Sequence, residues 1–575
     1  MKSFRSSLDA RQLWLMVLIA AVVGVASSIA AVTLRSGVHL LFDSLLELRN
    51  SSVGFLLPSI GALLGVWVVR QLFREPGGHG VPAVLESVSS GGGFMRRRSI
   101  VSRLLGSLFT VASGGSAGLE GPIVFSSAAV GSSIARSMKL AERQRVLLVA
   151  CGVAGGIGAI FNAPLTGLIF AMEVVLAEWT LGAVIPVAVS AAFATVSGRV
   201  VMGAEGAFNA AEFSWGIPDL LACVVLGTVA GLVSVALVRS IFSIETAARR
   251  LKQGDLLGRT GVVAAVAGLL VGLIAWWQPQ AAGEGYGLVN SILDGSANIA
   301  VPLLIALLAA KFLATTMTLG SNAPGGIFAP SLVIGALLGV GFGSLLHLLL
   351  PGSNLAAPGF FALVAMAGLV AGTMQAPFTG IFLALETTGG WDSTLPLMLV
   401  AVLSALVSRN LMRHSFYTWD LAESGRLLRP GTDVRILSDL YVGEMVDEES
   451  VSIESGSNLD DLVKLLPNTK RNHFAVVEGE SRRLLGVLDL SSLREFIFDE
   501  TLRSATSVDT VMNADIPSIR ADEPLTSAID LFESSGEWVL PIVDGDGAFL
   551  GTISKSTLFD RYRSELIVQT ASRQE

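Results

Sequence analysis

Two widely separated stretches of this chain are nearly alike, and both interrupt apolar sequence. Residues 162–173 (NAPLTGLIFAME) resemble residues 375–386 (QAPFTGIFLALE). A second pair precedes them, residues 118–122 (GLEGP) and 326–330 (GIFAP). Two halves that each contain a hydrophobic helix broken by Gly and Pro are typical of membrane transporters with internal repeats, whose substrate site lies between the repeats. The repeat therefore predicts passage of a solute across a membrane.

Composition supports a chain that lies mostly in lipid. Of its 575 residues, 52% are hydrophobic and 15% are charged, against about 25% charged in an average soluble domain. The first 440 residues contain 27 basic and 22 acidic side chains, a balance of +5, whereas residues 441–575 contain 12 and 25, a balance of −13. We therefore expect a basic membrane part and an acidic soluble tail, which does not bind nucleic acid.

The expected fold is an all-α polytopic membrane part with broken helices and an inverted internal repeat. Several of its apolar segments are shorter than the ~20 residues that a spanning helix needs, so they should end inside the protein. The apolar segments are residues 12–46, 53–73, 100–117, 122–138, 146–161, 164–179, 184–203, 217–243, 260–277, 299–319, 330–350, 358–374, 376–388 and 393–410.

Clusters of basic residues predict orientation. The positive-inside rule places loops rich in Lys and Arg in the cytoplasm, so we expect both termini there. The clusters are Arg70 with Arg74, Arg96–Arg98, Lys139 with Arg143 and Arg145, Arg249–Arg250 with Lys252, and Arg409 with Arg413.

The composition changes after Arg429, so we expect a membrane domain over residues 1–429 and a soluble domain over 430–575. The soluble domain contains two similar units, at about 440–500 and 505–565. Each unit shows a short apolar helix, a strand, an acidic turn and a second strand. The expected helices are 459–466 and 525–533, and the expected strands are 473–477, 484–489, 538–543 and 549–554. This α/β pattern resembles a tandem pair of CBS domains.

Glu120 is the candidate for a gate. It is a carboxylate in apolar sequence, flanked by Gly118 and Gly121 and followed by Pro122, which suits the first turn of a helix. The N-terminus of a helix attracts anions, because its N–H groups are unpaired and its dipole end is positive. Two such ends could strip water from a small anion, and an ionised Glu120 would compete with that anion. The alternative is a carboxylate that only caps its helix.

Four motifs together resemble the CLC family of chloride channels and chloride/proton antiporters over about residues 12–425, in its bacterial type with a CBS tail. Residues 118–122 are similar to the family's G-K/R-E-G-P, and residues 326–330 match G-x-F-x-P. Residues 78–82 are similar to G-S-G-I-P, and Tyr417 matches the tyrosine that contacts the anion.

The resemblance implies a homodimer in a bacterial inner membrane, with one pore for chloride or another small anion per subunit. It implies no enzyme activity and no metal. Glu120 carries over as the gating glutamate. The expected anion-binding residues are Gly78, His79, Gly80, Gly118, Leu119, Gly121, Gly326, Ile327, Phe328, Ala329 and Tyr417.

Three departures from the family pattern affect the expected mechanism. His79 replaces a serine and can still donate through a ring nitrogen. The alternative is that its ring turns away and its backbone contacts the anion. Leu119 removes a positive charge near the outer mouth. Val174 occupies the position of the inner proton station in several antiporters, which leaves Glu120 and Glu173 as candidates for a proton path. Val174 favours a voltage- or pH-gated channel, with the chloride/proton antiporter as the alternative.

The tail departs from the family pattern as well. CBS pairs grip adenine nucleotide through a Ser or Thr and an Asp after the second strand of each unit. The corresponding positions hold Asp489 with Ser492 and Ser554 with Thr557, so both aspartates of that pattern are missing. We therefore expect a dimerising packing module and keep nucleotide binding as the alternative.

Two alternatives to anion transport would rely on other residues of the chain. Residues 114–118 (GGSAG) fit the G-x-S-x-G pattern of a serine hydrolase, but no convincing partner set accompanies them among five histidines. A magnesium channel would need several oxygen ligands within the membrane. Glu120, Glu173 and Glu386 are too few for that task.

Overall fold

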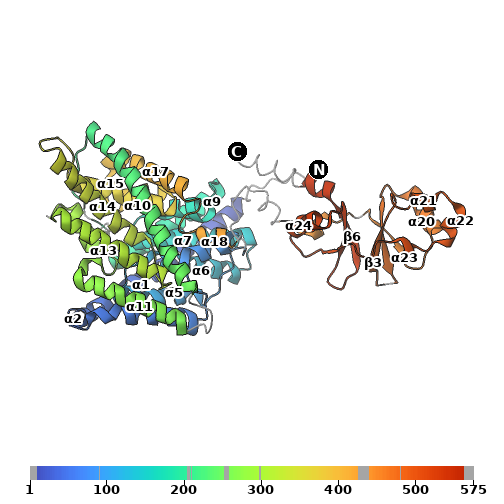
Figure 1. Ribbon diagram of the computed structural model, residues 1–575, viewed down its shortest axis with the longest axis horizontal. Coiled ribbons are helices and arrows are strands. Elements are labelled where there is room, and N and C mark those ends of the chain that lie inside the picture. Colours follow the sequence, from blue (N-terminus) through green and yellow to red (C-terminus); the bar gives the residue numbers. More distant parts are fainter. Residues whose placement is uncertain are drawn as a thin grey trace. The chain divides into compact units, whose positions relative to one another are not determined.

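The computed structural model describes residues 10–89, 91–203, 208, 210–250, 258–296, 299–424, 440–447, 449–479 and 481–561. Contacts divide the chain into two compact units, Met1–Leu427 and Leu428–Glu575 (Figure 1). The expected boundary at residues 429 and 430 lies outside the described ranges, as do the first nine residues and the chain from residue 562 onward.

The regular elements in the described part of the first unit are helices. Nine of them are long and apolar enough to span a membrane, counted over the described residues. The first half contains α1 (Ala10–Ser44), α2 (Leu46–Arg49), η1 (Gly54–Leu56), α3 (Leu57–Trp67), η2 (Val68–Leu72), α4 (Gly80–Ser89), α5 (Ser99–Ala112), α6 (Glu120–Ser137), α7 (Glu142–Phe161), α8 (Pro164–Phe170), η3 (Ala171–Leu176) and α9 (Leu181–Met202).

The second half contains α10 (Ile217–Arg250), α11 (Gly258–Trp277), η4 (Pro279–Ala281), α12 (Tyr286–Leu293), α13 (Val301–Gly320), α14 (Phe328–Leu349), α15 (Pro358–Met374), α16 (Pro377–Thr388), η5 (Trp391–Ser393), α17 (Thr394–Leu411) and α18 (Trp419–Glu423). Every predicted apolar segment overlaps a helix, which confirms the all-helical membrane part. The short helices α4, α12 and α18 are not among the predicted segments, because each is too short to give a clear apolar run.

The two halves repeat the same packing. In the first half α7 packs against α6, α1 and α9, and in the second half α15 packs against α14, α10 and α17. The backbone repeats as well: α7 ends at Asn162 (φ 57°) and α15 ends at Gln375 (φ 54°), both left-handed. Ala163 and Ala376 follow with nearly equal angles (φ −132°, ψ 81° and φ −127°, ψ 81°). The similar sequences thus adopt the same conformation twice.

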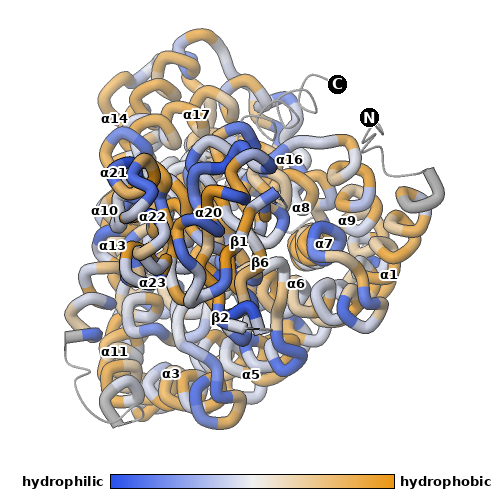
Figure 2. The backbone as a smooth tube through the Cα atoms, turned by 90° about the vertical axis from the view of Figure 1, so that its right-hand side faces the viewer, coloured by the Kyte–Doolittle hydropathy of each residue, from blue (hydrophilic) through white to orange (hydrophobic). Residues whose placement is uncertain are grey.

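The core of this unit lies around α7 and α15. Every residue of α7 from Leu148 to Phe161 is buried, and so is every residue of α15 from Gly359 to Met374. Helices that are hydrophobic all round belong inside a large core or a membrane. Figure 2 shows the outer helices, such as α14 and α17, as mostly hydrophobic too, as a lipid-facing surface requires.

The second unit contains two similar three-stranded sheets, in the orders β1-β2-β3 and β4-β5-β6. Each sheet has one parallel and one antiparallel pair. The elements are η6 (Val442–Met445), β1 (Val451–Glu454), α20 (Leu459–Leu465), η7 (Leu466–Asn468), β2 (His473–Glu478), β3 (Arg483–Asp489), α21 (Arg494–Ile497), α22 (Glu500–Ala505), α23 (Val508–Val511), β4 (Ile519–Arg520), α24 (Leu525–Ser535), β5 (Val539–Val543) and β6 (Phe549–Ser554). The predicted strands and helices of the tail match these elements to within two residues.

The two tail units exchange their first segments. Val442 and Met445, which the sequence places in the first unit, are buried in the core of the second unit. Val508 from the start of the second unit is buried in the core of the first. Each apolar segment thus finds its partners in the neighbouring sheet, so the two units form one module.

Candidate functional site

The two repeats meet at their Gly/Pro motifs. The N–H group of Gly118 donates to the carbonyl of Gly326 at 2.8 Å, and the N–H group of Gly326 donates to the carbonyl of Gly118 at 2.8 Å. Leu119 and Ile327, which directly precede α6 and α14, have nearly equal backbone angles (φ −89°, ψ −14° and φ −90°, ψ −15°). The two helices therefore begin beside each other, joined by this two-bond bridge.

The motif at residues 78–82 contacts the two other motifs through glycines. A Cβ atom on Gly80 would lie 2.4 Å from the carbonyl oxygen of Gly121, and one on Gly121 would lie 3.2 Å from the Cα atom of Gly326. Only glycine permits backbones to approach so closely. Because α4 begins at Gly80, the N-termini of α4, α6 and α14 converge. Their unpaired N–H groups favour an anion.

Glu120 lies fully buried at this convergence. Its Oε1 atom accepts a hydrogen bond of 2.7 Å from the hydroxyl of Tyr286. Its Oε2 atom has no hydrogen-bond partner among the described residues. Cβ atoms on Gly118 and Gly326 would lie 1.9 Å and 3.2 Å from Oε2, so the carboxylate is held against the bridge. We call this space, bounded by Gly118, Gly326 and Tyr286, the recess.

A group of rings lies beside the convergence. The His79 ring lies 4.7 Å from that of Phe416, which lies 5.6 Å from that of Tyr417, and Phe328 lies 6.4 Å from Tyr417. His79 and Tyr417 are buried, yet neither imidazole nitrogen nor the Tyr417 hydroxyl has a hydrogen-bond partner in the described part of the chain. Buried polar groups normally have partners, so these atoms mark a place for water or a ligand.

Arg103 fixes the loop that carries His79. It is buried, and its guanidinium donates to the carbonyl of Gly78 and, at 2.7 Å, to that of Pro76. The sequence analysis does not identify this residue, because an arginine in a helix that begins near a basic cluster looks like an orientation signal. Its charge and its two hydrogen bonds hold the N-terminal side of α4 in place.

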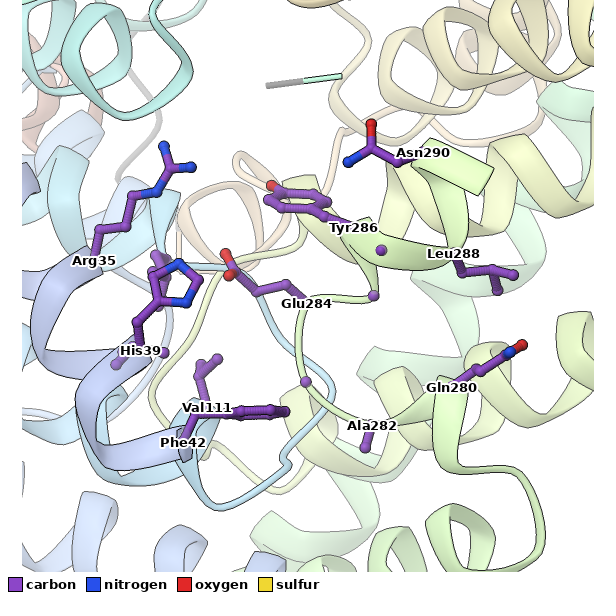
Figure 3. Close-up of a pocket in the computed structure, with 15 residues that line it drawn as sticks. Arg35, His39, Phe42, Val111, Gln280, Ala282, Glu284, Tyr286, Leu288 and Asn290 are labelled. Atoms are coloured by element: carbon purple, nitrogen blue, oxygen red, sulfur yellow. The ribbon is translucent and has the colours of Figure 1, made fainter. Parts of the chain in front are cut away.

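A cavity of about 400 Å³ adjoins the recess (Figure 3). Leu119 lines it together with Arg35 and His39 of α1. The sequence analysis expects Leu119 to remove a positive charge from the mouth of the pathway. The structure shows that a guanidinium from another helix lies at the same cavity, so a basic group is still available there.

Tyr286 is the second residue that sequence reasoning missed. It lies in residues 283–287 (GEGYG), a glycine-rich segment with a carboxylate and one of only four tyrosines in the chain. A tyrosine beside a carboxylate between two apolar helices is the signal that could have found it. Its partner Glu120 is distant in sequence, so the contact itself could not be predicted.

Glu173 has a structural task that the sequence analysis did not foresee. Its carboxylate accepts hydrogen bonds from the backbone N–H groups of Phe378 and Thr379, at 3.1 and 2.8 Å, and from the Thr379 hydroxyl at 2.7 Å. Glu386 does the same for the other repeat, accepting from Leu165 and Thr166. Each glutamate thus caps a short helix of the opposite half. A part for Glu173 in a proton path stays a prediction.

We expect Glu173→Ala and Glu386→Ala to destabilise the protein equally. Each change leaves two backbone N–H groups and one hydroxyl without their acceptor. Loss of a helix cap costs about 0.5–2 kcal/mol. Thermal unfolding in detergent should show similar decreases in melting temperature for both variants. A decrease in only one of them would contradict the equivalence of the two caps.

The serine of the G-x-S-x-G pattern is accounted for by packing. Ser116 Oγ lies 3.0 Å from the hydroxyl of Thr315, and the Ser116 N–H group donates to the Thr318 hydroxyl at 3.1 Å. A serine nucleophile needs a base within hydrogen-bond reach. Here the neighbour is another hydroxyl, so Ser116 attaches the loop between α5 and α6 to α13.

Comparison with known proteins agrees with this geometry. A family model described as voltage gated chloride channel matches residues 60–409, and one described as CBS domain matches residues 508–564. The chain is 30% identical over 412 residues to an H(+)/Cl(-) exchange transporter ClcA of Vibrio campbellii, covering 69% of this chain and 87% of the relative. It is 32% identical over 377 residues to a putative chloride channel protein ClcB-like of Ralstonia nicotianae, covering 64% and 85%.

Solved structures show the same fold. A slow cyanobacterial Cl-/H+ antiporter aligns with a TM-score of 0.64 at 24% identity, covering 71% of this chain and 98% of that one. A eukaryotic CLC transporter aligns with a TM-score of 0.62 at 19% identity, covering 95% and 98%. The family model spans more than half of the chain, and the paired helix ends lie within it. The chain belongs to the CLC family of voltage gated chloride channels and transporters.

Proposed function

We propose that this protein exchanges chloride for protons across the membrane, at a site formed by the N-termini of α4, α6 and α14 and by Tyr417. The observation that carries the proposal is the buried Glu120 carboxylate at the bridge between the repeats. One side chain at this point can hold a negative charge in place of an anion, or hold a proton and leave the site to the anion. Such a group couples the movement of chloride to the movement of protons.

The donors around the site favour an anion. Three helix ends offer N–H groups, and the Tyr417 hydroxyl and the His79 ring offer further donors without partners among the described residues. A metal cation would instead require several carboxylate or carbonyl oxygens. Chloride or another small anion therefore fits this chemistry best.

We place exchange before passive conduction because of what the similar proteins are named. Val174 favours a channel in the sequence analysis, but several relatives at about 30% identity are named H(+)/Cl(-) exchange transporters. The ClcB-like relative is named a putative chloride channel, so uncoupled conduction remains the second candidate. We keep Glu173 as a candidate proton station. Since it also caps α16, its conservative variant Glu173→Gln is the one to test.

The test is a pH electrode outside liposomes that contain the purified protein. With a chloride gradient and no initial pH gradient, we expect the flow of chloride down its gradient to drive protons the opposite way and so to build up a pH gradient. Potassium or magnesium gradients should drive no flux of those cations. Chloride flux without proton movement would support the channel, and cation flux without chloride flux would contradict the anion site altogether.

The assembly and the tail belong to the same proposal. We propose a homodimer in a bacterial inner membrane with the tail in the cytoplasm, where the tail serves as a packing module. The hydroxyls of Ser554 and Thr557 lie 2.8 Å apart, and Ser492 donates to the carbonyl of Asp489. These hydroxyls already have partners within the tail, which supports packing over nucleotide binding. Calorimetry of the protein with ATP and AMP tests this.

A further inference from the structure

The hydroxyl of Tyr286 is bonded to the group that we propose as the gate. The Tyr286 Oη atom lies 2.7 Å from Glu120 Oε1, the usual distance for an O–H···O hydrogen bond. The other oxygen, Oε2, has no hydrogen-bond partner among the described residues. Side-chain hydrogen bonding of the carboxylate in the recess therefore depends on Tyr286.

Tyr286 is held rigidly. Its ring packs edge-on against Phe208, with centroids 5.1 Å apart and planes at 86°. It is the first residue of α12, directly after Gly285, whose left-handed backbone (φ 87°) turns the chain into the helix. The buried Lys311 donates to the carbonyls of Ala281 and Gly283, at 3.3 and 2.7 Å. These contacts fix the loop before α12, and so they fix the hydroxyl.

A cavity lies beside the recess, and Tyr286 borders both. Tyr286 lines the cavity of about 400 Å³, together with Arg35, His39 and Glu284. Figure 3 shows these side chains surrounding a common space, with the Tyr286 ring across from Arg35. Tyr286 therefore contacts both the Glu120 carboxylate and this cavity.

We propose that Tyr286 is a positioning residue that holds the ionised Glu120 carboxylate in the recess, and that its hydroxyl sets the pH at which the gate is released. The inference rests on the proposed gating role of Glu120. Among the described side chains, Tyr286 is the one that donates to this carboxylate, and the backbone N–H groups of Glu120 and Ala329 add to its stabilisation.

The direction of the effect follows from charge. A hydroxyl bonds more strongly to an ionised carboxylate than to a neutral carboxyl. Tyr286 therefore favours the ionised, closed state, and protonation weakens the bond and frees the side chain. Without the hydroxyl, protonation and release should occur at a higher pH. A hydrogen bond to a charged group changes such an equilibrium by about tenfold or more, which is about one pH unit.

Four other charged or titratable side chains lie near Glu120. Arg35 and His39 of α1 line the adjoining cavity. Lys311 of α13 donates to the carbonyl of Gly283 in the loop before α12. Glu284 is the remaining carboxyl of the cavity. Burial, followed by the nearby Glu120 charge, raises the pKa of Glu284 to about 8. Glu284 is therefore mostly protonated at pH 7 and does not explain a transition in the acid range.

The experiment measures chloride flux from liposomes as a function of pH for Tyr286→Phe. Phenylalanine keeps the ring that packs against Phe208 and removes only the hydroxyl. We expect the pH of half-maximal flux to rise by about one unit, equivalent to a tenfold change. Tyr441→Phe, an exposed tyrosine of the tail, is the control and should leave the pH profile unchanged. Melting temperatures of both variants test for a loss of fold.

The same substitution in a Glu120→Gln background separates the two proposals. If Tyr286 acts through Glu120, the added Tyr286→Phe change should leave the pH profile of that background unaltered. An unchanged profile of Tyr286→Phe alone, or an equal shift in both backgrounds, would overturn the role of Tyr286. If Glu120→Gln by itself kept the wild-type pH dependence, the gate itself would be wrong, and Tyr286 could not act through it.

Discussion

In Glu120→Gln, we expect chloride flux to continue while chloride-driven proton movement stops and the flux loses its dependence on pH. Glutamine has the shape of the protonated glutamate and can still accept the hydrogen bond of Tyr286, which now lies 2.7 Å from Oε1. It cannot ionise, so it neither competes with the anion as a charge nor passes on a proton. Flux at neutral pH should therefore equal flux in acid, and the pH electrode should record no uphill movement.

The control for this variant is Asp294→Asn, an exposed carboxylate at the end of α12. It removes one charge as well, and it should keep both the coupling and the pH profile. Uphill proton movement that persisted in Glu120→Gln would place the proton path elsewhere. Loss of all flux in this variant would show that the neutral side chain still blocks the site, which contradicts gating by charge.

The sequence predicts the long helices of the membrane part because each is encoded by a continuous run of apolar residues. An apolar run such as residues 358–374 is long enough to name a buried helix, and α15 has the same bounds. The tail strands were equally predictable, since residues 549–554 follow an acidic turn, and β6 occupies that range. In both cases the residues that decide the structure lie next to one another in the chain.

The parts of the site that depend on distant contacts were not predictable. The helices α4 and α12 are short and contain polar residues, so no apolar run reveals them. Tyr286 and Glu120 meet only because the repeats pack together. The likeness of residues 162–173 and 375–386 was visible, but not that each final glutamate caps the helix of the other repeat. A repeated motif indicates that two segments adopt the same conformation. It does not indicate which groups of the two segments form hydrogen bonds with each other.

Gly326→Ala should strongly reduce transport. A Cβ atom there would lie 2.8 Å from the backbone nitrogen of Gly121 and 3.2 Å from Glu120 Oε2, and a backbone atom cannot rotate away as a side chain can. The two-bond bridge to Gly118 must then open, at a cost of about 1–3 kcal/mol for overpacking, which separates the helix ends that bind the anion. We expect chloride flux from liposomes to fall by about tenfold or more, since 1.4 kcal/mol is already a factor of ten. Gly341→Ala, in the helix α14 that follows Gly326, is the matched control, because its Cβ atom would meet nothing within 4 Å. Flux that stayed equal in the two variants would show that anion binding does not require the close approach of the repeats.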